Sequence, residues 1–412
     1  MTSSQWDLAK TTLLLGSGTS QPSGYPLTAE ITDTLLSKNW LFDRDQARAP
    51  YPLNGVEGNY PLEIEAVWGL LRILRDHISQ HLAMHGNGEA NYEDIYFLAR
   101  QLLDGLKGEY DNPGLLPLMF ELRTKVSIMM ENLNANYGFD NPLKEPVQLG
   151  LGGLLGQGID FIEECVAGQL APREPINGLQ FLNELLATDT KRLLHVVSLN
   201  HDTLLEAHFA AHEVLDGFVP ISKDVAEFDP TSFDNGCSAR VQLLKLHGSI
   251  DWFRYKSNSG DDLALKVLSN DRDRVKGRGG EALFPPQNRL MLAGTTNKEL
   301  AYGSGVFLEL MFQFHKRLKE TELLIVSGYG FADKGINNRL WAWLDARQGN
   351  RLVVLHEKPD ELRRDAKPSF SHNVDRHKKS GKFVLVDKWM CNCSLEDVKR
   401  EIRFAKAESS DN

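Results

Sequence analysis

Four short polar segments, each directly after an apolar run, carry residue types that could do chemistry. They are Gly16-Ser17-Gly18, Ser198-Leu199-Asn200-His201-Asp202, His247-Gly248-Ser249 and Ser327-Gly328-Tyr329-Gly330. An imidazole exchanges protons near neutral pH, and glycines let a backbone approach a phosphate closely. For any one segment the simpler interpretation is a polar loop, with Asn200 or Asp202 capping a helix and His247 as an ordinary strand-end histidine. The combination of four segments favours a common site.

The first segment lies in TTLLLGSGTSQPSGYP, which predicts a strand, a glycine loop and a helix. Residues 11–15 are β-branched or apolar, as in a buried strand, and Gly16 and Gly18 lack the Cβ that keeps another backbone at a distance. Pro26 suits the first turn of a helix that continues over residues 27–36. The dipole of such a helix start favours a phosphate by about 0.3–1 kcal/mol. The loop lacks the G-x-G-x-x-G spacing, so a connecting turn is an equally good interpretation.

Five further apolar runs, which begin at residue 193, predict strands covered on both faces. They are LLHVVSLN, VQLLKLHG, ELLIVSGYG, RLVVLHE and KFVLVDKW, and helical stretches alternate with several of them. This alternation predicts an α/β fold with a Rossmann-like, mostly parallel sheet and helices on both faces. Ligands of such sheets bind beyond the carboxyl ends of the strands, where all four polar segments fall.

Amphipathic helical patterns between about residues 57 and 190 predict a large helical insertion domain. They include LEIEAVWGLLRILRDHISQHLAMH, YEDIYFLARQLLDGLKG, LPLMFELRTKVSIMMENLNANYG, IDFIEECVAGQL and LQFLNELLATD. The glycine-rich VQLGLGGLLGQG is expected to break this block. The predicted domains are residues 1–56 as the first part of the Rossmann-like domain, 57–190 as the insertion, 191–404 as the remainder of the Rossmann-like domain, and 405–412 as a polar, disordered tail.

Composition limits the classes of partner. The chain has 412 residues and a formal net charge of −10, so it has no general attraction for nucleic acid. The basic stretches DRDRVKGRGG and RHKKSGK are short and are interpreted as solvated loops. We therefore expect no direct binding of nucleic acid.

The sequence shows neither a targeting signal nor the cysteine spacing of a zinc-binding motif. The start, MTSSQWDLAK, has no basic segment followed by an apolar one, and no run reaches the roughly 18 apolar residues of a membrane helix. We expect a cytoplasmic protein that binds no membrane. The cysteines are Cys165, Cys237, Cys391 and Cys393, which do not form paired C-x-x-C knuckles. They are expected to be reduced, and we expect no bound metal.

Taken together, the four segments resemble the sirtuins. GSGTSQPSGYP looks like the sirtuin loop Gly-Ala-Gly-x-Ser followed by Gly-x-Pro, SLNHD looks like Thr-x-Asn-x-Asp, and KLHGS looks like the catalytic His-Gly. The later GYGFADKGIN is similar to a Gly-Tyr-Ser-Phe-x-Asp segment common in bacterial sirtuin-like proteins of antiphage defence. The resemblance covers the Rossmann-like part and leaves out residues 57–190.

The departures from the sirtuins narrow the implied activity. Sirtuin deacylases carry Asp-Phe-Arg after Gly-x-Pro and a four-cysteine zinc module, whereas this chain reads Leu27-Thr28-Ala29 and has no such module. The resemblance therefore implies an NAD+ glycohydrolase that uses NAD as its substrate and releases nicotinamide and ADP-ribose. In sirtuin-like defence proteins this activity depletes NAD, as an abortive-infection effector does.

The resemblance also implies roles for individual residues. Asn200 holds the ribose hydroxyls and the attacking water, His247 accepts a proton, and Asp202 meets the carboxamide or orients the loop of Asn200. The implied NAD-binding residues are Gly16, Ser17, Gly18 and Ser20 around the pyrophosphate, Ser327, Gly328 and Asp333 along the adenosine, and Ser198.

Three other activities stay open. A protein deacylase or ADP-ribosyltransferase would share the NAD site but need a channel for a peptide. A dehydrogenase would need an acidic ribose partner about 20 residues past the glycines in a second strand, where the pattern predicts a helix. A nucleotide-binding sensor subunit would bind NAD without turnover.

No motif in the sequence identifies a protein partner, so partners are expected only from the implied activity and from the resemblance. An enzyme that destroys NAD needs control, for which the helical insertion offers a surface. By resemblance to two-component defence systems, we expect homo-oligomers and a HerA-type ATPase or an Argonaute-like protein as partner.

Overall fold

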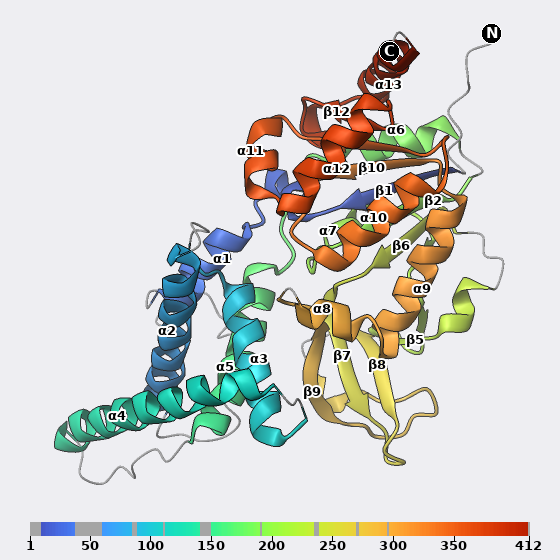
Figure 1. The fold of residues 1–412 in the computed structure, drawn as a ribbon. Coiled ribbons are helices and arrows are strands. Elements are labelled where there is room, and N and C mark those ends of the chain that lie inside the picture. The colour runs from blue at the N-terminus through green and yellow to red at the C-terminus, as the bar shows by residue number, and fades with distance from the viewer. Residues whose placement is uncertain are drawn as a thin grey trace. The chain divides into compact units, whose positions relative to one another are not determined.

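The computed structural model describes residues 10–37, 60–84, 89–109, 112–140, 150–189, 192–234, 239–268, 272–294 and 296–410. Contacts divide the chain into two units (Figure 1). Unit 1 comprises Met1–Tyr25, Leu170–Leu292 and Thr296–Asn412, and unit 2 comprises Pro26–Gln169 and Ala293–Thr295. The insertion predicted from sequence spans 57–190, whereas the structure assigns α1 (Thr28–Leu36) to unit 2 and α6 (Gln180–Thr188) to unit 1.

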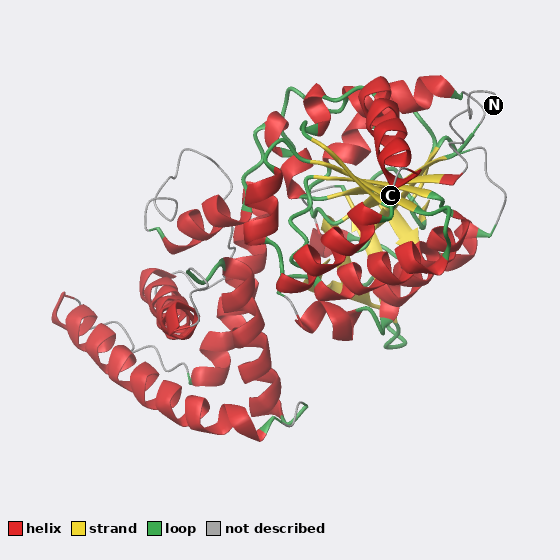
Figure 2. Cartoon of the chain, turned by 45° about the horizontal axis from the view of Figure 1, so that its top comes forward, coloured by secondary structure: helices red, strands yellow, loops and turns green. Residues whose placement is uncertain are grey.

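Unit 1 contains a seven-stranded sheet in which every neighbouring pair is parallel. Its order is β12 (Phe383–Val386), β11 (Arg351–Leu355), β10 (Leu323–Ser327), β1 (Thr11–Leu15), β2 (Leu194–Ser198), β6 (Val241–Lys245) and β3 (Val214–Leu215). Besides α6, the helices of this unit are α7 (Leu204–His208), α8 (Thr296–Ala301), α9 (Gly305–Glu320), α10 (Lys334–Ala346), α11 (Pro359–Asp365), α12 (Pro368–Lys379) and α13 (Leu395–Ser410). Helices lie on both faces of the sheet (Figure 2), so the predicted α/β fold is confirmed.

The chain changes direction across the sheet at β1. All five residues of β1 are buried, as expected for a central strand covered on both faces. From β1 the chain proceeds to β2 and β6, and it then returns to β10 on the other side of β1 and continues to β11 and β12. Doubly wound sheets bind ligands at such a switch point, beyond the carboxyl ends of the strands. The polar segments after β1 and β10 both start at this point.

A second sheet in unit 1 was not predicted. It is antiparallel, with the order β4 (Phe218–Pro220), β5 (Val225–Phe228), β8 (Asp262–Val267), β7 (Gly248–Lys256) and β9 (Phe284–Met291). Successive side chains of β7 point to opposite faces: Trp252 packs in the main core, whereas Phe253 and Tyr255 pack in a small separate cluster with Leu265. Only two residues separate the end of β6 from the start of β7, so His247 lies where the two sheets meet.

Unit 2 is helical in its described part. It contains α1, α2 (Tyr60–Met84), α3 (Tyr92–Lys107), α4 (Leu116–Asp140) and α5 (Leu151–Gln169). The prediction that VQLGLGGLLGQG breaks the helices is wrong for residues 151–158, because α5 runs through the glycines from Leu151 onward; Gly150 is not helical, and residues 147–149 lie outside the described residues. Each glycine costs a helix about 1 kcal/mol, but burial of Leu154 and Leu155 stabilises the helix by roughly 1.5–3 kcal/mol per side chain. Gly158 also lets α5 approach Leu71, which a Cβ would meet at 3.3 Å.

Two predictions about element ends are also wrong. The tail predicted at residues 405–412 is helical as far as Ser410, because α13 continues to that residue. Pro26 does not lie in the first turn of α1, because Leu27 is the N-cap and its N–H donates to the Glu30 carboxylate at 2.8 Å. Two short 3-10 turns occupy the loop between β1 and α1 instead. None of the described helices has both the length and the apolar composition needed to cross a membrane.

The glycines that follow β1 and β10 allow these two strand ends to touch. A Cβ on Gly16 would lie 2.5 Å from the carbonyl oxygen of Gly328, and one on Gly18 would lie 2.9 Å from its Cα. Gly328 itself has a φ of 65°, and a Cβ there would lie 2.3 Å from the nitrogen of Thr19. Contacts this short with backbone atoms cannot be relieved by turning a side chain. These glycines are therefore required for packing, whatever they bind.

We predict that Gly16→Ala lowers the free energy of unfolding by about 1–3 kcal/mol, because the methyl group must push two backbones apart. Urea denaturation followed by tryptophan fluorescence measures this change. Gly330→Ala is the matched control, since no atom lies within 4 Å of the added Cβ and its φ is not in the positive range. Equal stability of the two variants would contradict the close contact.

Ionisation of Asp160 on α5 makes the folded state less stable as the pH rises. Burial and the neighbouring Glu164 raise the pKa of Asp160 from 3.8 to about 6, and Arg100 opposes this rise. A carboxyl group whose pKa is higher in the folded state stabilises the fold below pH 3.8, and that stability is lost as the pH rises through 6.

We therefore predict that Asp160→Asn melts at a higher temperature than the wild type at pH 7.5 and that this gain shrinks at pH 5. Glu164→Gln should give a smaller gain, because it removes only one of the two causes. A difference between Asp160→Asn and wild type that is the same at both pH values would contradict the shifted pKa. Differential scanning calorimetry of the whole chain measures both.

Candidate active site

Asn200 follows β2 and is 6% exposed. Its Nδ2 donates to the carbonyl oxygen of Gly16 at 3.1 Å and to Oγ of Ser20 at 3.0 Å. A carbonyl oxygen only accepts, so the contact with Gly16 fixes which end of the amide carries the hydrogens. Oδ1 of Asn200 is then left buried with no hydrogen-bond partner among the described residues. A buried acceptor without a partner is costly, which marks this oxygen as one that a ligand or water would satisfy.

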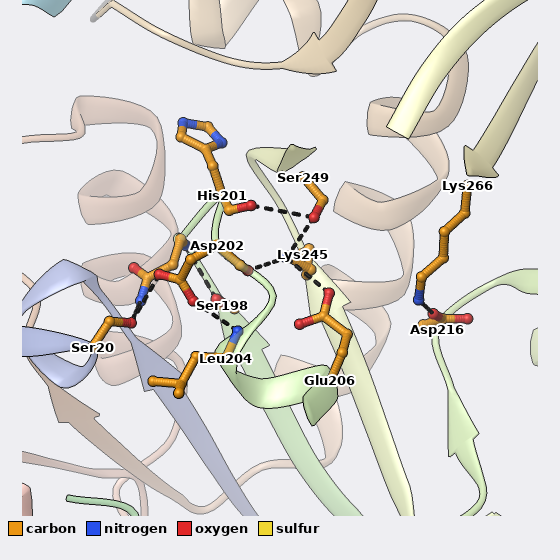
Figure 3. Close-up of polar contacts among 11 residues, drawn as sticks. Ser20, Ser198, His201, Asp202, Leu204, Glu206, Asp216, Lys245, Ser249 and Lys266 are labelled. Carbon is orange, nitrogen blue, oxygen red and sulfur yellow. Dashed lines mark hydrogen bonds and ion pairs between the residues drawn. The ribbon is translucent and has the colours of Figure 1, made fainter. Parts of the chain in front are cut away.

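Asp202 sets the direction of this hydrogen-bond chain (Figure 3). Oγ of Ser20 donates to Oδ2 of Asp202 at 2.8 Å, so the hydroxyl oxygen is free to accept from Asn200. Oδ1 of Asp202 accepts from the N–H of Leu204, the first residue of α7, at 3.1 Å. Burial raises the pKa of Asp202, while Lys245 and the hydrogen bond from Ser20 lower it. The N-cap of α7 is Thr203, so Asp202 is not the helix cap of the simpler interpretation; it binds the N–H of Leu204 from one residue before the cap and also orients the amide of Asn200.

His247 is placed by the turn between β6 and β7. The next residue, Gly248, has a φ of 78°, and a Cβ there would lie only 1.9 Å from the carbonyl oxygen of Leu290. Only glycine fits this turn, which explains the His-Gly pair. The carbonyl of His247 accepts from the N–H of Leu292 at 2.8 Å, which ties the turn to the end of β9.

The imidazole of His247 is 4% exposed and contacts three loops. Nδ1 lies 3.1 Å from the carbonyl oxygen of Leu199 and must donate to it, so in the neutral ring Nε2 carries the lone pair. Nε2 lies 2.8 Å from the hydroxyl of Tyr302 and 3.1 Å from Oδ2 of Asp333. Because Leu199 directly precedes Asn200, the structure brings the predicted residues Asn200 and His247 to adjacent positions.

Asp333 is the charged partner of His247 in this arrangement. It follows β10 and caps α10, with Oδ1 accepting from the N–H of Ile336 at 3.0 Å. Burial opposes its ionisation, but the hydrogen bond and charge that His247 supplies when protonated, together with Lys298, outweigh it and lower the pKa of Asp333. Burial and the Asp333 carboxylate raise the pKa of Tyr302, whose hydroxyl lies 3.0 Å from Oδ2 of Asp333. Asp333, which was predicted to lie along the adenosine, therefore contacts His247, the candidate catalytic histidine.

The glycine loop is bonded to its own neighbours. The N–H groups of Gly16 and Gly18 donate to the carbonyls of Ser327 and Gly328 at 2.9 and 3.0 Å, and that of Ser20 donates to the carbonyl of Ser17 at 3.0 Å. Three amides expected to face a pyrophosphate thus have backbone partners, and a phosphate would have to replace them. Ser17 is exposed, whereas Oγ of Ser198 accepts from the N–H of Asn200 at 3.1 Å. The NAD-binding roles of these residues stay predictions.

Two buried polar residues of this region, Tyr302 and Lys245, were not predicted from the sequence. Tyr302 lies in the turn between α8 and α9, and no pattern in AYGSG distinguishes it from any other loop tyrosine. Lys245 could have been found, because a lysine that ends the apolar strand VQLLK needs partners if both faces of the sheet are covered. It is 1% exposed.

The described residues contain no group of three or more His, Cys, Asp or Glu side chains arranged to hold a metal ion. Cys165, Cys391 and Cys393 are free thiols, and Cys237 lies outside the described residues.

Residues 194–375 match the family model of the SIR2-like domain. The SIR2-like match spans β2 to α12, so it includes Ser198, Asn200, Asp202, His247, Ser327, Gly328 and Asp333. It covers less than half of the chain and leaves out the glycine loop after β1. No curated protein matches the chain.

Solved structures of sirtuins show a distant likeness. A crystal structure of a Sir2 homolog–NAD complex is 11% identical, with 97% of this chain and 91% of that chain covered and a TM-score of 0.38. A structure concerning the mechanism and regulation of Sir2 enzymes is 12% identical, with 98% and 95% covered and a TM-score of 0.35. Sir2Tm bound to a propionylated peptide is 11% identical, with 97% and 92% covered and a TM-score of 0.32. These values are too low to carry residue roles to this chain.

We predict that Asp333→Asn flattens the acid dependence of stability. A carboxylate with a lowered pKa stabilises the fold above its ordinary value of 3.8, and this stability is lost as the pH falls below it. The asparagine keeps an oxygen for the N–H of Ile336 but has no charge for His247. Urea denaturation at pH 7, 4 and 3 should therefore show a steeper loss for the wild type.

Asp375→Asn serves as the control, because Asp375 is exposed and pairs with Arg363 on the surface. Its acid dependence should parallel that of the wild type. If Asp333→Asn also parallels the wild type, the Asp333 carboxylate does not interact with His247 as described.

Proposed function

We propose that this chain is an NAD+ glycohydrolase that cleaves the bond between nicotinamide and ribose and releases nicotinamide and ADP-ribose. The observation that carries the proposal is Oδ1 of Asn200, a buried acceptor without a partner beside the β1–β10 switch point. A ribose hydroxyl or a water molecule supplies the donor that this oxygen lacks. The SIR2-like match at residues 194–375 supports NAD as the ligand.

A buried amide oxygen without a partner does not by itself indicate a ligand site, because Asn200 is not the only described residue that has one. Asn350 also has a buried Oδ1 without a partner and is 1% exposed. It directly precedes β11, however, and so lies at the amino ends of the parallel strands, where these sheets do not bind ligands. Asn200 differs by its position at the carboxyl ends and by its proximity to His247.

The chemistry needs a small set of groups. The C–N bond breaks with its electron pair going to the pyridinium nitrogen, so nicotinamide leaves as a neutral molecule and no strong acid is needed. Water then bonds to the ribose carbon and loses one proton. Asn200 would orient the water or the ribose hydroxyls through Oδ1, while Nδ2 stays held by Gly16 and Ser20.

His247 is suited to take that proton. Its Nδ1–H is committed to the carbonyl of Leu199, so Nε2 is the basic atom. Once protonated, Nε2 would donate to Asp333, whose carboxylate stabilises the imidazolium. The hydroxyl of Tyr302 lies 2.8 Å from Nε2 and 3.0 Å from Oδ2 of Asp333, so it would donate to Nε2 while the ring is neutral. A positioned base of this kind contributes about 10²–10⁴-fold.

We predict that Asn200→Ala lowers the rate of nicotinamide release by at least about 100-fold, because the group that orients the nucleophile is lost. Purified protein is incubated with NAD, together with any partner that activation requires, and nicotinamide is measured by chromatography. Asn350→Ala is the matched control, since it removes a buried amide at the amino ends of the strands and should keep the wild-type rate per folded molecule. Full activity in Asn200→Ala would remove this residue from the mechanism.

The same preparation separates the remaining candidate activities. An acylated peptide added with NAD would be deacylated by a sirtuin deacylase but left intact by a glycohydrolase. A sensor subunit would bind NAD in a calorimeter and release no nicotinamide.

We further propose that NAD depletion is its biological task, as in sirtuin-like proteins of antiphage defence that act by abortive infection. The segment GYGFADKGIN supports this assignment by its similarity to such proteins. The proposal includes homo-oligomers, a cytoplasmic location and activation by a HerA-type ATPase or an Argonaute-like partner. Loss of cellular NAD after phage infection, dependent on Asn200, is the expected outcome in cells.

A further inference from the structure

Lys245, the last residue of β6, has the most buried charge near the site. Its side chain is 1% exposed, and Nζ donates to the carbonyl oxygen of Asp202 at 2.5 Å, to Oγ of Ser249 at 2.7 Å and to Oε1 of Glu206 at 2.8 Å. An ammonium group has three hydrogens, and here each has an acceptor (Figure 3).

Stability alone is a poor explanation for this lysine. The free energy needed to take two charges out of water is about as large as the free energy gained from their mutual attraction. Apolar side chains of similar size often stabilise a fold as well or better. The ammonium does something that an apolar group cannot do, which is to hold neighbouring carbonyl groups in fixed positions. The groups that Lys245 holds therefore indicate its role.

The groups held by Lys245 belong to the loop that carries Asn200. Nζ binds the carbonyl of Asp202 directly, and Ser249, which accepts from Nζ, donates to the carbonyl of His201 at 3.2 Å. Two successive carbonyls of the loop are thus fixed from one ammonium group. The side chain of Asp202 then holds Ser20, and Ser20 holds Asn200.

We propose that Lys245 is a positioning residue, whose ammonium group fixes the loop of residues 199–203 and through it the orientation of the Asn200 amide. Its effect on turnover rests on the proposed function, whereas its effect on the loop does not. Lys245 touches no reacting atom in this scheme.

Lys266 on β8 provides a matched comparison. Its side chain is 16% exposed and binds Oδ2 of Asp216 at 2.8 Å. Burial opposes its charge, but Asp216, Glu206 and Asp251 outweigh burial and raise the pKa of Lys266. Figure 3 shows the Lys266–Asp216 pair apart from the contacts of Lys245. Removing either lysine breaks an ion pair with an acidic side chain, but of the two lysines only Lys245 is bonded to the loop.

The test compares Lys245→Met with Lys266→Met in the full chain. Hydrogen–deuterium exchange of a peptide covering residues 199–203 should become faster in Lys245→Met and stay at the wild-type rate in Lys266→Met. In the NAD assay, below the melting temperatures of both variants, kcat of Lys245→Met should fall by about 10- to 100-fold, with KM changed only a few-fold. Lys266→Met should keep the wild-type kcat.

The outcomes separate the two proposals. Unchanged exchange in the loop of Lys245→Met, or a kcat equal to that of Lys266→Met, overturns the positioning role. If the wild type releases no nicotinamide, only the proposed function falls, and the exchange measurement decides the role of Lys245 by itself. If Lys245→Met does not fold, Ser249→Ala removes the link to His201 and should show the same change in exchange and kcat to a smaller degree; wild-type values there would overturn the proposal.

Discussion

The site depends on one constraint, which is that the buried imidazole of His247 has to satisfy both ring nitrogens inside the protein. Nδ1 donates to the carbonyl of Leu199, and Nε2 accepts from Tyr302 in the neutral ring or donates to Asp333 in the protonated ring. These partners come from the ends of β2 and β10 and from the turn after α8, so one ring fixes three loops that are distant in sequence. A polar group left unpaired at this depth costs about 1–3 kcal/mol, which disfavours any arrangement that separates them.

A second set of contacts gives the amide of Asn200 a single orientation. Lys245 fixes the carbonyl of Asp202, Asp202 accepts from Ser20, and Ser20 accepts from Asn200. Each hydroxyl or amide hydrogen in this series has one possible direction, because a carboxylate and a carbonyl only accept. The two sets meet at the peptide between Leu199 and Asn200. The unpartnered Oδ1 therefore belongs to a group whose every other contact is determined.

The sequence was informative where chain topology alone brings residues together. Parallel strands end at one edge of the sheet, so apolar runs followed by Gly16, Asn200 and Ser327 predicted neighbours without any knowledge of side-chain contacts. The same reasoning could not find Tyr302, which no strand positions, or the antiparallel sheet, in which strands such as β5 and β7 mix polar with apolar residues. The helix through the glycines of α5 was missed because packing against α2 and α3 outweighs local propensity.

The two carboxylates of the site are placed for support rather than for direct attack. Ordinary glycosidases use a pair of carboxyl groups, one as proton donor and one as base or nucleophile. Here both oxygens of Asp202 accept hydrogen bonds, and both oxygens of Asp333 are engaged with the start of α10, Tyr302 or His247. The lowered pKa of Asp333 also keeps it from carrying a proton near neutral pH. Such a pair suits a bond whose leaving group departs as a neutral molecule, because that cleavage requires an oriented nucleophile and a base but no acid.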